Sequence, residues 1–240
     1  MNVVIVVIGL LSTVMVTTMC TIVRAKPKAI VIGGSFAGLV SARSLSEHYD
    51  VTLIEKDSTL ALSSSSSTVE RLRSRPSVPQ GKHIHILLAQ GSKILEELFP
   101  GVKADLVKKG GEMVDFPAVY ANCIDGRFHQ RDPNSSYDIS TILCSRVLIE
   151  ETVRERVSKL PGVNIISGGR VTSLLREGSR VSGVVCRVVD HVVNASIGED
   201  TALHADLIVD TMGRGTRSSE WLKKLGFGVP EEEVSIFLRI

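Results

Sequence analysis

Hydrophobic and polar residues are grouped in blocks along the chain, and the first block is the longest. No charged residue occurs in the 21 residues from Val3 to Val23. At about 1.5 Å of rise per residue, a helix of this length crosses the roughly 30 Å hydrocarbon core of a bilayer. The run therefore predicts a hydrophobic N-terminal helix that anchors the protein in a membrane through residues 3–23.

Basic residues follow this run and indicate its orientation. Arg24, Lys26 and Lys28 lie on its C-terminal side, whereas its N-terminal side offers only the α-amino group. Positive charge collects on the cytoplasmic side of a membrane, so we expect a single-pass protein whose following domain faces the cytoplasm. A cleaved signal within residues 1–25 would instead make the protein secreted or lumenal, although its usual basic start is missing. A start codon assigned too early is a third interpretation.

The next blocks follow the order strand, glycine-rich turn, helix, strand. Residues 29–33 form an apolar run typical of a buried parallel strand, and Gly-Gly-Ser-Phe-Ala-Gly over residues 33–38 follows. A helical stretch then runs to His48, and a second apolar strand over residues 51–54 ends at Glu55. This order, with an acid just after the second strand, predicts a Rossmann-like dinucleotide-binding unit.

Each residue type in this unit has a physical task. Gly33 makes the tight turn, and Ser35 is small enough for the backbone to approach a pyrophosphate. Gly38 lets the helix pack closely on the sheet, and the first amides of that helix point at the anion. Glu55 can accept hydrogen bonds from a ribose hydroxyl. The alternative is a glycine-rich turn in some other α/β domain.

Later patterns complete an α/β fold with a parallel sheet and a β-meander. Five serines, Ser63–Ser67, predict a flexible loop within residues 58–82. Residues 83–101 predict a helix that stops at Pro100-Gly101. Residues 163–167 predict a third parallel strand, and residues 181–189 predict β-structure that completes a meander around Gly178-Ser179.

Composition removes several classes of function. The chain has 28 basic and 26 acidic residues and only 4% aromatic residues, so neither a basic patch nor a stacking platform for nucleic acid is expected. The four cysteines are widely spaced and predict inert thiols rather than a disulfide framework. His83 and His85 alternate but have no third ligand at a suitable spacing, so no metal site is expected.

Three segments resemble one known family. They read "VIGGSFAGLVSARSL", "RPSVPQGKHIHILLAQGSKILEELFPG" and "ADLIVDTMGRGTRSSEWLKKLGF". They are similar to FAD-dependent monooxygenases of the para-hydroxybenzoate-hydroxylase fold, in the branch that contains polyether epoxidases and related FAD oxidoreductases. The third segment departs from the family's second fingerprint, because Met212 stands where many members have an aspartate.

The resemblance implies roles for residues of this chain. The pyrophosphate of FAD would contact residues of the turn: Gly33, Gly34, Ser35, Ala37 and Gly38. Glu55 would hold the adenosine ribose, with Lys56 beside it, and the backbone of Val171 would meet the adenine. Arg146, in an element that opens a helix, would contact the flavin; an ordinary exposed helix arginine is the alternative.

The function that the resemblance implies is insertion of one oxygen atom from O2 into an apolar small molecule, as hydroxylation or epoxidation. In this chemistry the flavin carries the reaction, so no catalytic side chain is expected from the motifs. A second GxGxxG is missing, so electrons would come from NAD(P)H bound over the flavin site or from a partner reductase. A non-catalytic remnant that binds FAD or ADP, and a prenyl-lipid flavin reductase of the same superfamily, are the alternatives.

The expected organisation has three parts: an anchor or signal segment over residues 1–27, an FAD-binding domain over residues 28–228, and the start of a substrate domain over residues 229–240. Family members continue beyond this point through a further FAD-binding motif. We therefore expect the chain to be a fragment of a longer enzyme, a truncated gene product or a degenerate relative.

Overall fold

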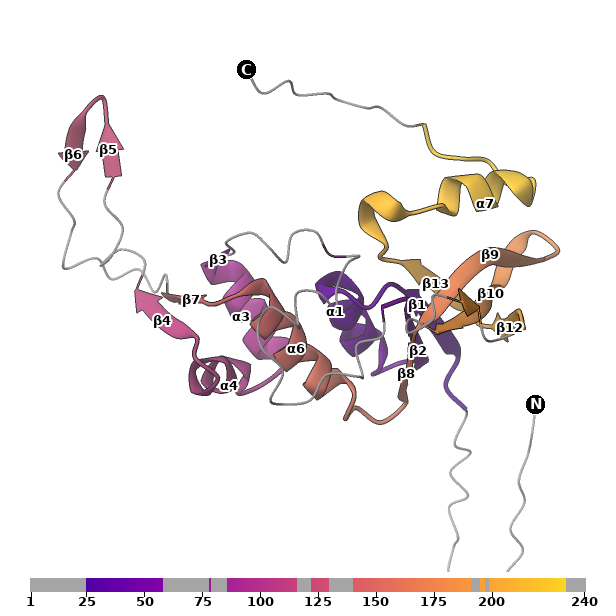
Figure 1. The fold of residues 1–240 in the computed structure, drawn as a ribbon, viewed down its shortest axis with the longest axis horizontal. Helices are drawn as coiled ribbons and strands as arrows, with labels where there is room; N and C mark the ends of the chain where they lie inside the picture. Colours follow the sequence, from indigo (N-terminus) through magenta and orange to yellow (C-terminus); the bar gives the residue numbers. More distant parts are fainter. Residues whose placement is uncertain are drawn as a thin grey trace, which may run out of the picture.

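The structure, a computed structural model, describes residues 25–57, 78, 86–115, 122–129, 140–190, 195–196 and 199–231. Its main body has three layers: a group of helices, a parallel β-sheet and a β-meander (Figure 1). A smaller antiparallel sheet and a hairpin extend from the helical layer.

The parallel sheet is the middle layer and contains strands β1 (Lys28–Ile32), β2 (Asp50–Glu55), β8 (Val163–Ser167) and β13 (Leu207–Asp210). Its strand order is β13-β1-β2-β8, and every neighbouring pair is parallel. The three parallel strands predicted from the apolar runs are therefore confirmed, and β13 joins them from the far end of the chain.

A group of four helices lies on one side of this sheet: α1 (Phe36–Leu45), α3 (Ala89–Leu98), α4 (Val102–Lys108) and α6 (Arg146–Val157). Helix α1 packs directly on β1 and β2, and the other three helices lie beyond it (Figure 1). Because side chains alternate along a strand, one set from β1 and β2 faces the helices. This set is Ala29, Val31, Val51 and Leu53, and all four are at most 2% exposed. They form one hydrophobic core with apolar residues of the helices, among them Leu39, Leu106 and Val153.

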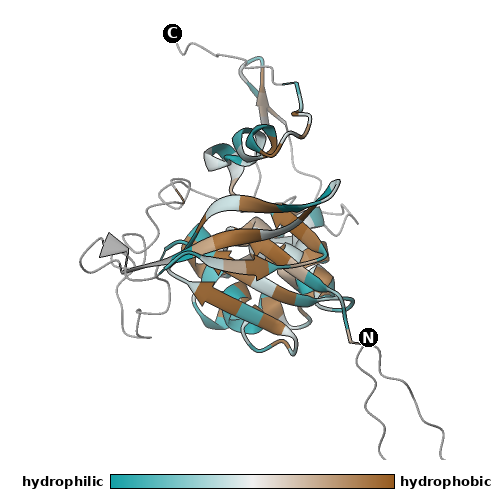
Figure 2. Ribbon diagram, turned by 90° about the vertical axis from the view of Figure 1, so that its right-hand side faces the viewer, coloured by the Kyte–Doolittle hydropathy of each residue, from teal (hydrophilic) through white to brown (hydrophobic). Residues whose placement is uncertain are grey.

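The β-meander covers the other face. Its strands are β9 (Gly169–Glu177), β10 (Arg180–Asp190), β11 (Ala195–Ser196) and β12 (Thr201–His204). A tight turn at Gly178, with φ of +61°, joins β9 to β10, as the sequence predicted. The intervening side chains form a second core, which includes Ile30, Ile54 and Trp221 of helix α7 (Ser218–Lys224). Figure 2, viewed from the meander side, shows hydrophobic residues throughout the strands of this layered region.

The remaining strands lie outside the three layers. Strands β3 (Ile86–Leu87), β7 (Ser140–Leu143) and β4 (Glu112–Asp115) form an antiparallel sheet, and β5 (Asn122–Ile124) pairs with β6 (Arg127–His129). The prediction of a helix over residues 83–101 is wrong at its start, because Ile86 and Leu87 pair with β7 and the helix begins at Ala89. Its end is correct: α3 stops at Leu98, and Gly101 adopts φ of +82°.

Several predictions concern segments outside the described residues. These include the membrane anchor at residues 3–23, the serine loop at Ser63–Ser67 and the histidines His83 and His85. Among the ranges given above, no helix is both long enough and apolar enough to cross a membrane.

Candidate dinucleotide site

The glycine-rich turn lies at the carboxyl end of β1, beside the carboxyl end of β2. Gly33 has φ of +103°, a conformation that side-chain-bearing residues rarely adopt. Its N–H donates to the carbonyl oxygen of Ile54 at 2.8 Å, which ties the turn to β2. The chain then leaves the sheet and starts α1 at Phe36. Ligands bind at this edge in open α/β sheets, outside the carboxyl ends of the strands.

This turn has no room for side chains at two of its glycines. A Cβ atom on Gly38 would lie 1.8 Å from the carbonyl oxygen of Gly33. A Cβ atom on Gly34 would lie 2.8 Å from the Cβ atom of Glu55. Helix α1 and the end of β1 thus approach each other through bare backbone, as expected for Gly38. A cradle of this kind suits a phosphate group that must come close to the main chain.

The first amides of α1 are available to an anion. Ser35 precedes the helix in an extended conformation, and its side chain makes no capping hydrogen bond. The first turn of α1 contains no acidic residue, and the Ser35 N–H has no hydrogen-bond partner among the described residues. Exposed amides and the positive end of the helix dipole make such a terminus an anion-binding site.

Glu55 lies at the end of β2 as predicted, but its carboxylate already has backbone partners. It is only 3% exposed. One oxygen accepts the N–H of Gly34 at 2.9 Å, and the other accepts the N–H of Asp57 at 2.8 Å. Glu55 therefore shapes the turn from the position where the sequence predicts the ribose contact.

The end of β13 contributes to the same edge through Thr211, a residue that the sequence analysis did not select. Its Oγ1 atom lies 2.8 Å from the carbonyl oxygens of both Ile32 and Gly33. Asp210 organises the segment that follows, since its carboxylate accepts the N–H of Met212 at 2.8 Å and the hydroxyl hydrogens of Thr216 and Ser218. In this network Asp210 is the acceptor, and Met212 contributes only its backbone N–H.

Helix α6 lies beside α1 and brings Arg146 to the turn. Ser145 caps the helix by accepting the N–H of Leu148 at 3.1 Å, which confirms that a helix opens here. The guanidinium of Arg146 stacks over the ring of Phe36 at 5.2 Å from its centroid. Its Nε atom is buried and has no hydrogen-bond partner in the described part of the chain. This Nε–H group could therefore donate a hydrogen bond to a ligand that binds beside Phe36.

A second arginine of α6, also not selected from the sequence, touches the turn directly. The Nη2 atom of Arg154 donates to the carbonyl oxygen of Gly34 at 2.6 Å and to Glu150 at 2.7 Å. Both side chains of this ion pair are largely buried. The signal was weak, because an i,i+4 pair of opposite charges is common on exposed helix faces.

Of the other predicted site residues, Ala37 and Lys56 lie close to the turn, and Val171 lies in the meander. Ala37 is exposed in the first turn of α1, and Lys56 is exposed just beyond β2. Val171 lies in β9, opposite Cys186 of β10, and its side chain belongs to the second core. Contact of these residues with a cofactor stays a prediction, as it does for Gly33, Gly34, Ser35, Gly38, Glu55 and Arg146.

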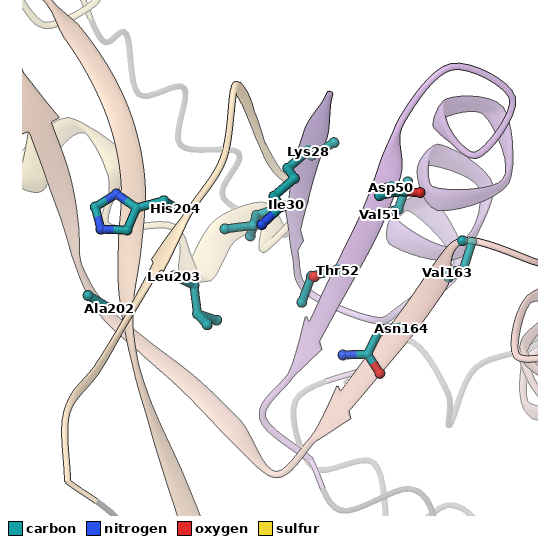
Figure 3. Close-up of a pocket in the computed structure, with 12 residues that line it drawn as sticks. Lys28, Ile30, Asp50, Val51, Thr52, Val163, Asn164, Ala202, Leu203 and His204 are labelled. Carbon is teal, nitrogen blue, oxygen red and sulfur yellow. The ribbon is translucent and has the colours of Figure 1, made fainter. Parts of the chain in front are cut away.

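A cavity of about 570 Å³ lies at the opposite edge of the sheet. The amino halves of β1, β2 and β8 form one wall, and β12 forms the other (Figure 3). Polar side chains such as Thr52, Asn164 and His204 line it. Because these residues surround the amino ends of the strands, the cavity is not part of the predicted dinucleotide site.

In the described ranges, no group of three or more His, Cys, Asp or Glu side chains could hold a metal ion. Cys123, Cys144 and Cys186 are free thiols. Burial raises the pKa of both Cys144 and Cys186, so these two are less reactive than ordinary thiols, whereas Cys123 is exposed.

Comparisons with known proteins agree with this architecture. A family model described as an NAD(P)-binding Rossmann-like domain matches residues 31–98. Protein Rv3254 of Mycobacterium tuberculosis (strain ATCC 25618 / H37Rv) is 32% identical over 212 residues, which are 87% of this chain and 42% of that protein. The chain therefore spans less than half the length of this curated relative.

Solved structures give the same picture of the fold. PqsL of Pseudomonas aeruginosa, described as a probable FAD-dependent monooxygenase, superimposes with a TM-score of 0.56 at 14% identity, covering 87% of this chain and 48% of PqsL. The p-nitrophenol 4-monooxygenase PnpA of Pseudomonas putida DLL-E4 has a TM-score of 0.56 at 15% identity, covering 82% of this chain and 43% of PnpA. THI4 of Thermovibrio ammonificans has a TM-score of 0.52 at 16% identity, covering 85% of this chain and 64% of THI4.

These similarities define the class of fold. The chain contains a Rossmann-like α/β domain with a parallel sheet, and the family model for NAD(P)-binding Rossmann-like domains matches its residues 31–98. Over the part that it covers, its fold is similar to that of PqsL and PnpA, in agreement with the predicted para-hydroxybenzoate-hydroxylase fold.

Proposed function

We propose that this chain is the FAD-binding part of a flavin-dependent monooxygenase and that its glycine-rich turn binds the ADP half of FAD. One observation carries the proposal: a tight glycine turn, an uncapped helix N-terminus and a buried acid meet at the carboxyl edge of one parallel sheet. NAD also contains an ADP half, so the geometry alone does not distinguish the two dinucleotides. The sequence resemblance and the FAD-dependent monooxygenases of similar fold support FAD.

Different residues of the site would contact different parts of the cofactor. The amides of Ser35, Phe36 and Ala37 would face the pyrophosphate, since the helix N-terminus attracts negative charge. Glu55 would accept a hydroxyl of the adenosine ribose. Arg146 would use its buried Nε atom to donate to the cofactor beside Phe36.

Bound FAD would supply the oxygen chemistry, namely activation of O2 and transfer of one oxygen atom to an apolar small molecule by hydroxylation or epoxidation. The residues of this chain would bind and orient the cofactor. Electrons would come from NAD(P)H or from a partner reductase. The substrate class rests on the resemblance, and the neighbours of known structure support monooxygenase chemistry in general.

We further propose that residues 3–23 attach the protein to a membrane and leave the FAD domain in the cytoplasm. The length of the uncharged run and the basic residues after it support this placement. In a eukaryotic host, the full chain should pellet with membranes, and a variant lacking residues 1–27 should stay in the supernatant. A glycosidase-sensitive mass shift at Asn134 or Asn194, which both lie in sequons, would place the domain in a lumen instead.

Calorimetric titration of the purified chain with FAD, ADP and NADH tests the cofactor assignment. We expect FAD and ADP to bind and to compete with each other, because they share the ADP half. Tighter binding of FAD than of ADP would show that residues of this chain also contact the flavin half. Binding of NADH in preference to FAD would reject the flavin assignment and favour a nicotinamide-dependent protein.

A further inference from the structure

Two consecutive peptide groups of the glycine-rich turn are held by side chains from distant parts of the chain. In the first, the Gly33 carbonyl oxygen accepts the Thr211 hydroxyl at 2.8 Å, and the Gly34 N–H donates to Glu55 at 2.9 Å. In the second, the Gly34 carbonyl oxygen accepts a hydrogen bond from Arg154 at 2.6 Å. The Ser35 N–H belongs to this second peptide group and has no partner in the described part of the chain.

Arg154 is itself fixed by Glu150, one helical turn earlier in α6. Their side chains are 12% and 6% exposed, and their charged atoms are 2.7 Å apart. Removing two charges from water costs several kcal/mol, so a buried ion pair is a poor means of stabilising a fold. The pair holds the guanidinium against the carbonyl oxygen of Gly34, and this placement gives it a role other than stabilising the fold.

We infer that Arg154 is a positioning residue for the pyrophosphate of the bound dinucleotide. A peptide group is planar and trans, so its C=O and N–H point in opposite directions. By holding the Gly34 carbonyl oxygen, Arg154 directs the Ser35 N–H away from α6, to the side where it can meet the phosphate oxygens. Glu150 keeps the guanidinium in place and balances its charge. This inference rests on the proposed nucleotide site. It means that a side chain of α6 sets the orientation of the Ser35 N–H, the first amide of that site.

The test compares two charge-balanced double variants. Glu150→Gln with Arg154→Met, called the clamp variant, removes both charges of the ion pair that holds the Gly34 carbonyl oxygen. Asp105→Asn with Arg156→Met is the matched control. Arg156 also lies on α6, and it donates to the carboxylate of Asp105 at 2.6 Å and to the carbonyl oxygen of Pro100 at 2.8 Å. It has no hydrogen bond to the glycine-rich turn. Titrations with ADP and with adenosine, which lacks phosphate, measure the effect.

We expect the clamp variant to lose about tenfold in ADP affinity, as for one hydrogen bond to a charged group, and to bind adenosine as the parent does. The control should bind both ligands like the parent. In amide NMR spectra, ADP should shift the Ser35 signal strongly in the parent and weakly in the clamp variant. If the double variant does not fold, Arg154→Lys, which keeps the charge but not the planar fork, should show the same selectivity for ADP.

Undiminished ADP affinity in the clamp variant would overturn the inference. Equal losses for ADP and adenosine would overturn it as well, because they would indicate a general structural role. A parent chain that binds ADP and adenosine equally well would also overturn it, because no phosphate would then be recognised. A parent chain that binds neither ligand would reject the proposed nucleotide site itself, and that failure is visible before any variant is made.

Discussion

The hydroxyl oxygen of Thr211 lies 2.8 Å from the carbonyl oxygen of Gly33, which connects two turns separated by 178 residues. The backbone N–H of Thr211 also donates to Ile32 at 2.9 Å, so β13 is bonded to β1 and to the turn that follows β1. The same hydroxyl fills the space beside Gly38, where a Cβ atom would lie 2.9 Å from it. The glycine-rich turn after β1 and the segment after β13 therefore form one structural unit.

Replacement of Thr211 by valine should weaken this unit while keeping its shape. The Gly33 carbonyl oxygen would lose its only described donor, and an unpaired half-buried polar group costs about 1–3 kcal/mol. We expect the free energy of unfolding to fall by about 1–2 kcal/mol in urea titrations. ADP affinity should also decrease, because the first peptide group of the turn loses its support.

Thr172→Val is the control for this substitution. Thr172 lies in β9, and its hydroxyl makes only a long 3.4 Å bond to the carbonyl oxygen of Val185. It should unfold at a urea concentration close to that of the parent. Equal destabilisation by the two variants would mean that the Thr211 contact has no special role.

The difference between Thr211 and the predicted site residues shows what the sequence can reveal. Gly33, Gly38 and Glu55 fall within one strand–turn–helix–strand segment, so their spacing alone indicates their shared location. Thr211 and Arg154 reach the same turn through the packing of β13 and α6. A single sequence does not report which distant residues pack together, and a threonine or an arginine has many structural uses.

For the fold, too, local patterns were predicted correctly and pairing between distant segments was not. The apolar runs at residues 29–33, 51–54 and 163–167 became adjacent parallel strands, because buried strands carry a strong local signal. The antiparallel sheet of β3, β7 and β4 was missed, since β3 has only two residues and its pairing with β7 spans more than fifty positions. Such short strands depend on their partners rather than on their own pattern.

Alanine substitutions at two helical glycines should have opposite effects. In Gly38→Ala, the new methyl group would meet the Gly33 carbonyl oxygen at 1.8 Å, so the backbone of α1 must move away from β1. We expect a loss of stability of about 1–3 kcal/mol or more, together with loss of ADP binding. In Gly91→Ala, within α3, the methyl group meets only the Leu87 side chain at an ordinary 3.4 Å.

Gly91→Ala should therefore raise stability by about 0.5–1 kcal/mol, because alanine restricts the unfolded chain and favours a helix. Thermal and urea unfolding of both variants measure these changes. Stabilisation by Gly38→Ala would contradict the close packing of α1 on β1.

The three described thiols should differ in their rates of alkylation. Burial raises the pKa of Cys144 and of Cys186, so at neutral pH each has a smaller thiolate fraction and limited access to reagents. Cys123 is exposed in hairpin strand β5. Peptide mass spectrometry after a short iodoacetamide treatment should find Cys123 modified first, with the other two gaining reactivity as pH rises. Preferential modification of Cys186 would contradict its burial in the second core.

Glu55 should be tested by a variant and a ligand that each remove one side of the same contact. In Glu55→Gln, one carboxylate oxygen becomes an NH2 group, which cannot accept the N–H of Gly34 or of Asp57 and offers one fewer acceptor to the ribose. Since hydrogen bonds to charged groups contribute about 1.5–3 kcal/mol, we expect ADP affinity to fall by about one to two powers of ten.

Loosening of the turn alone would weaken the binding of ADP and of 2′-deoxy-ADP by the same factor. A direct bond from Glu55 to the ribose 2′-hydroxyl predicts instead that the parent prefers ADP over 2′-deoxy-ADP and that the variant loses this preference. Glu177→Gln, at the exposed end of β9, should retain the parent's affinities for both ligands. If the preference for the 2′-hydroxyl survives in Glu55→Gln, then another residue holds the ribose, and Glu55 acts on the nucleotide only by shaping the turn.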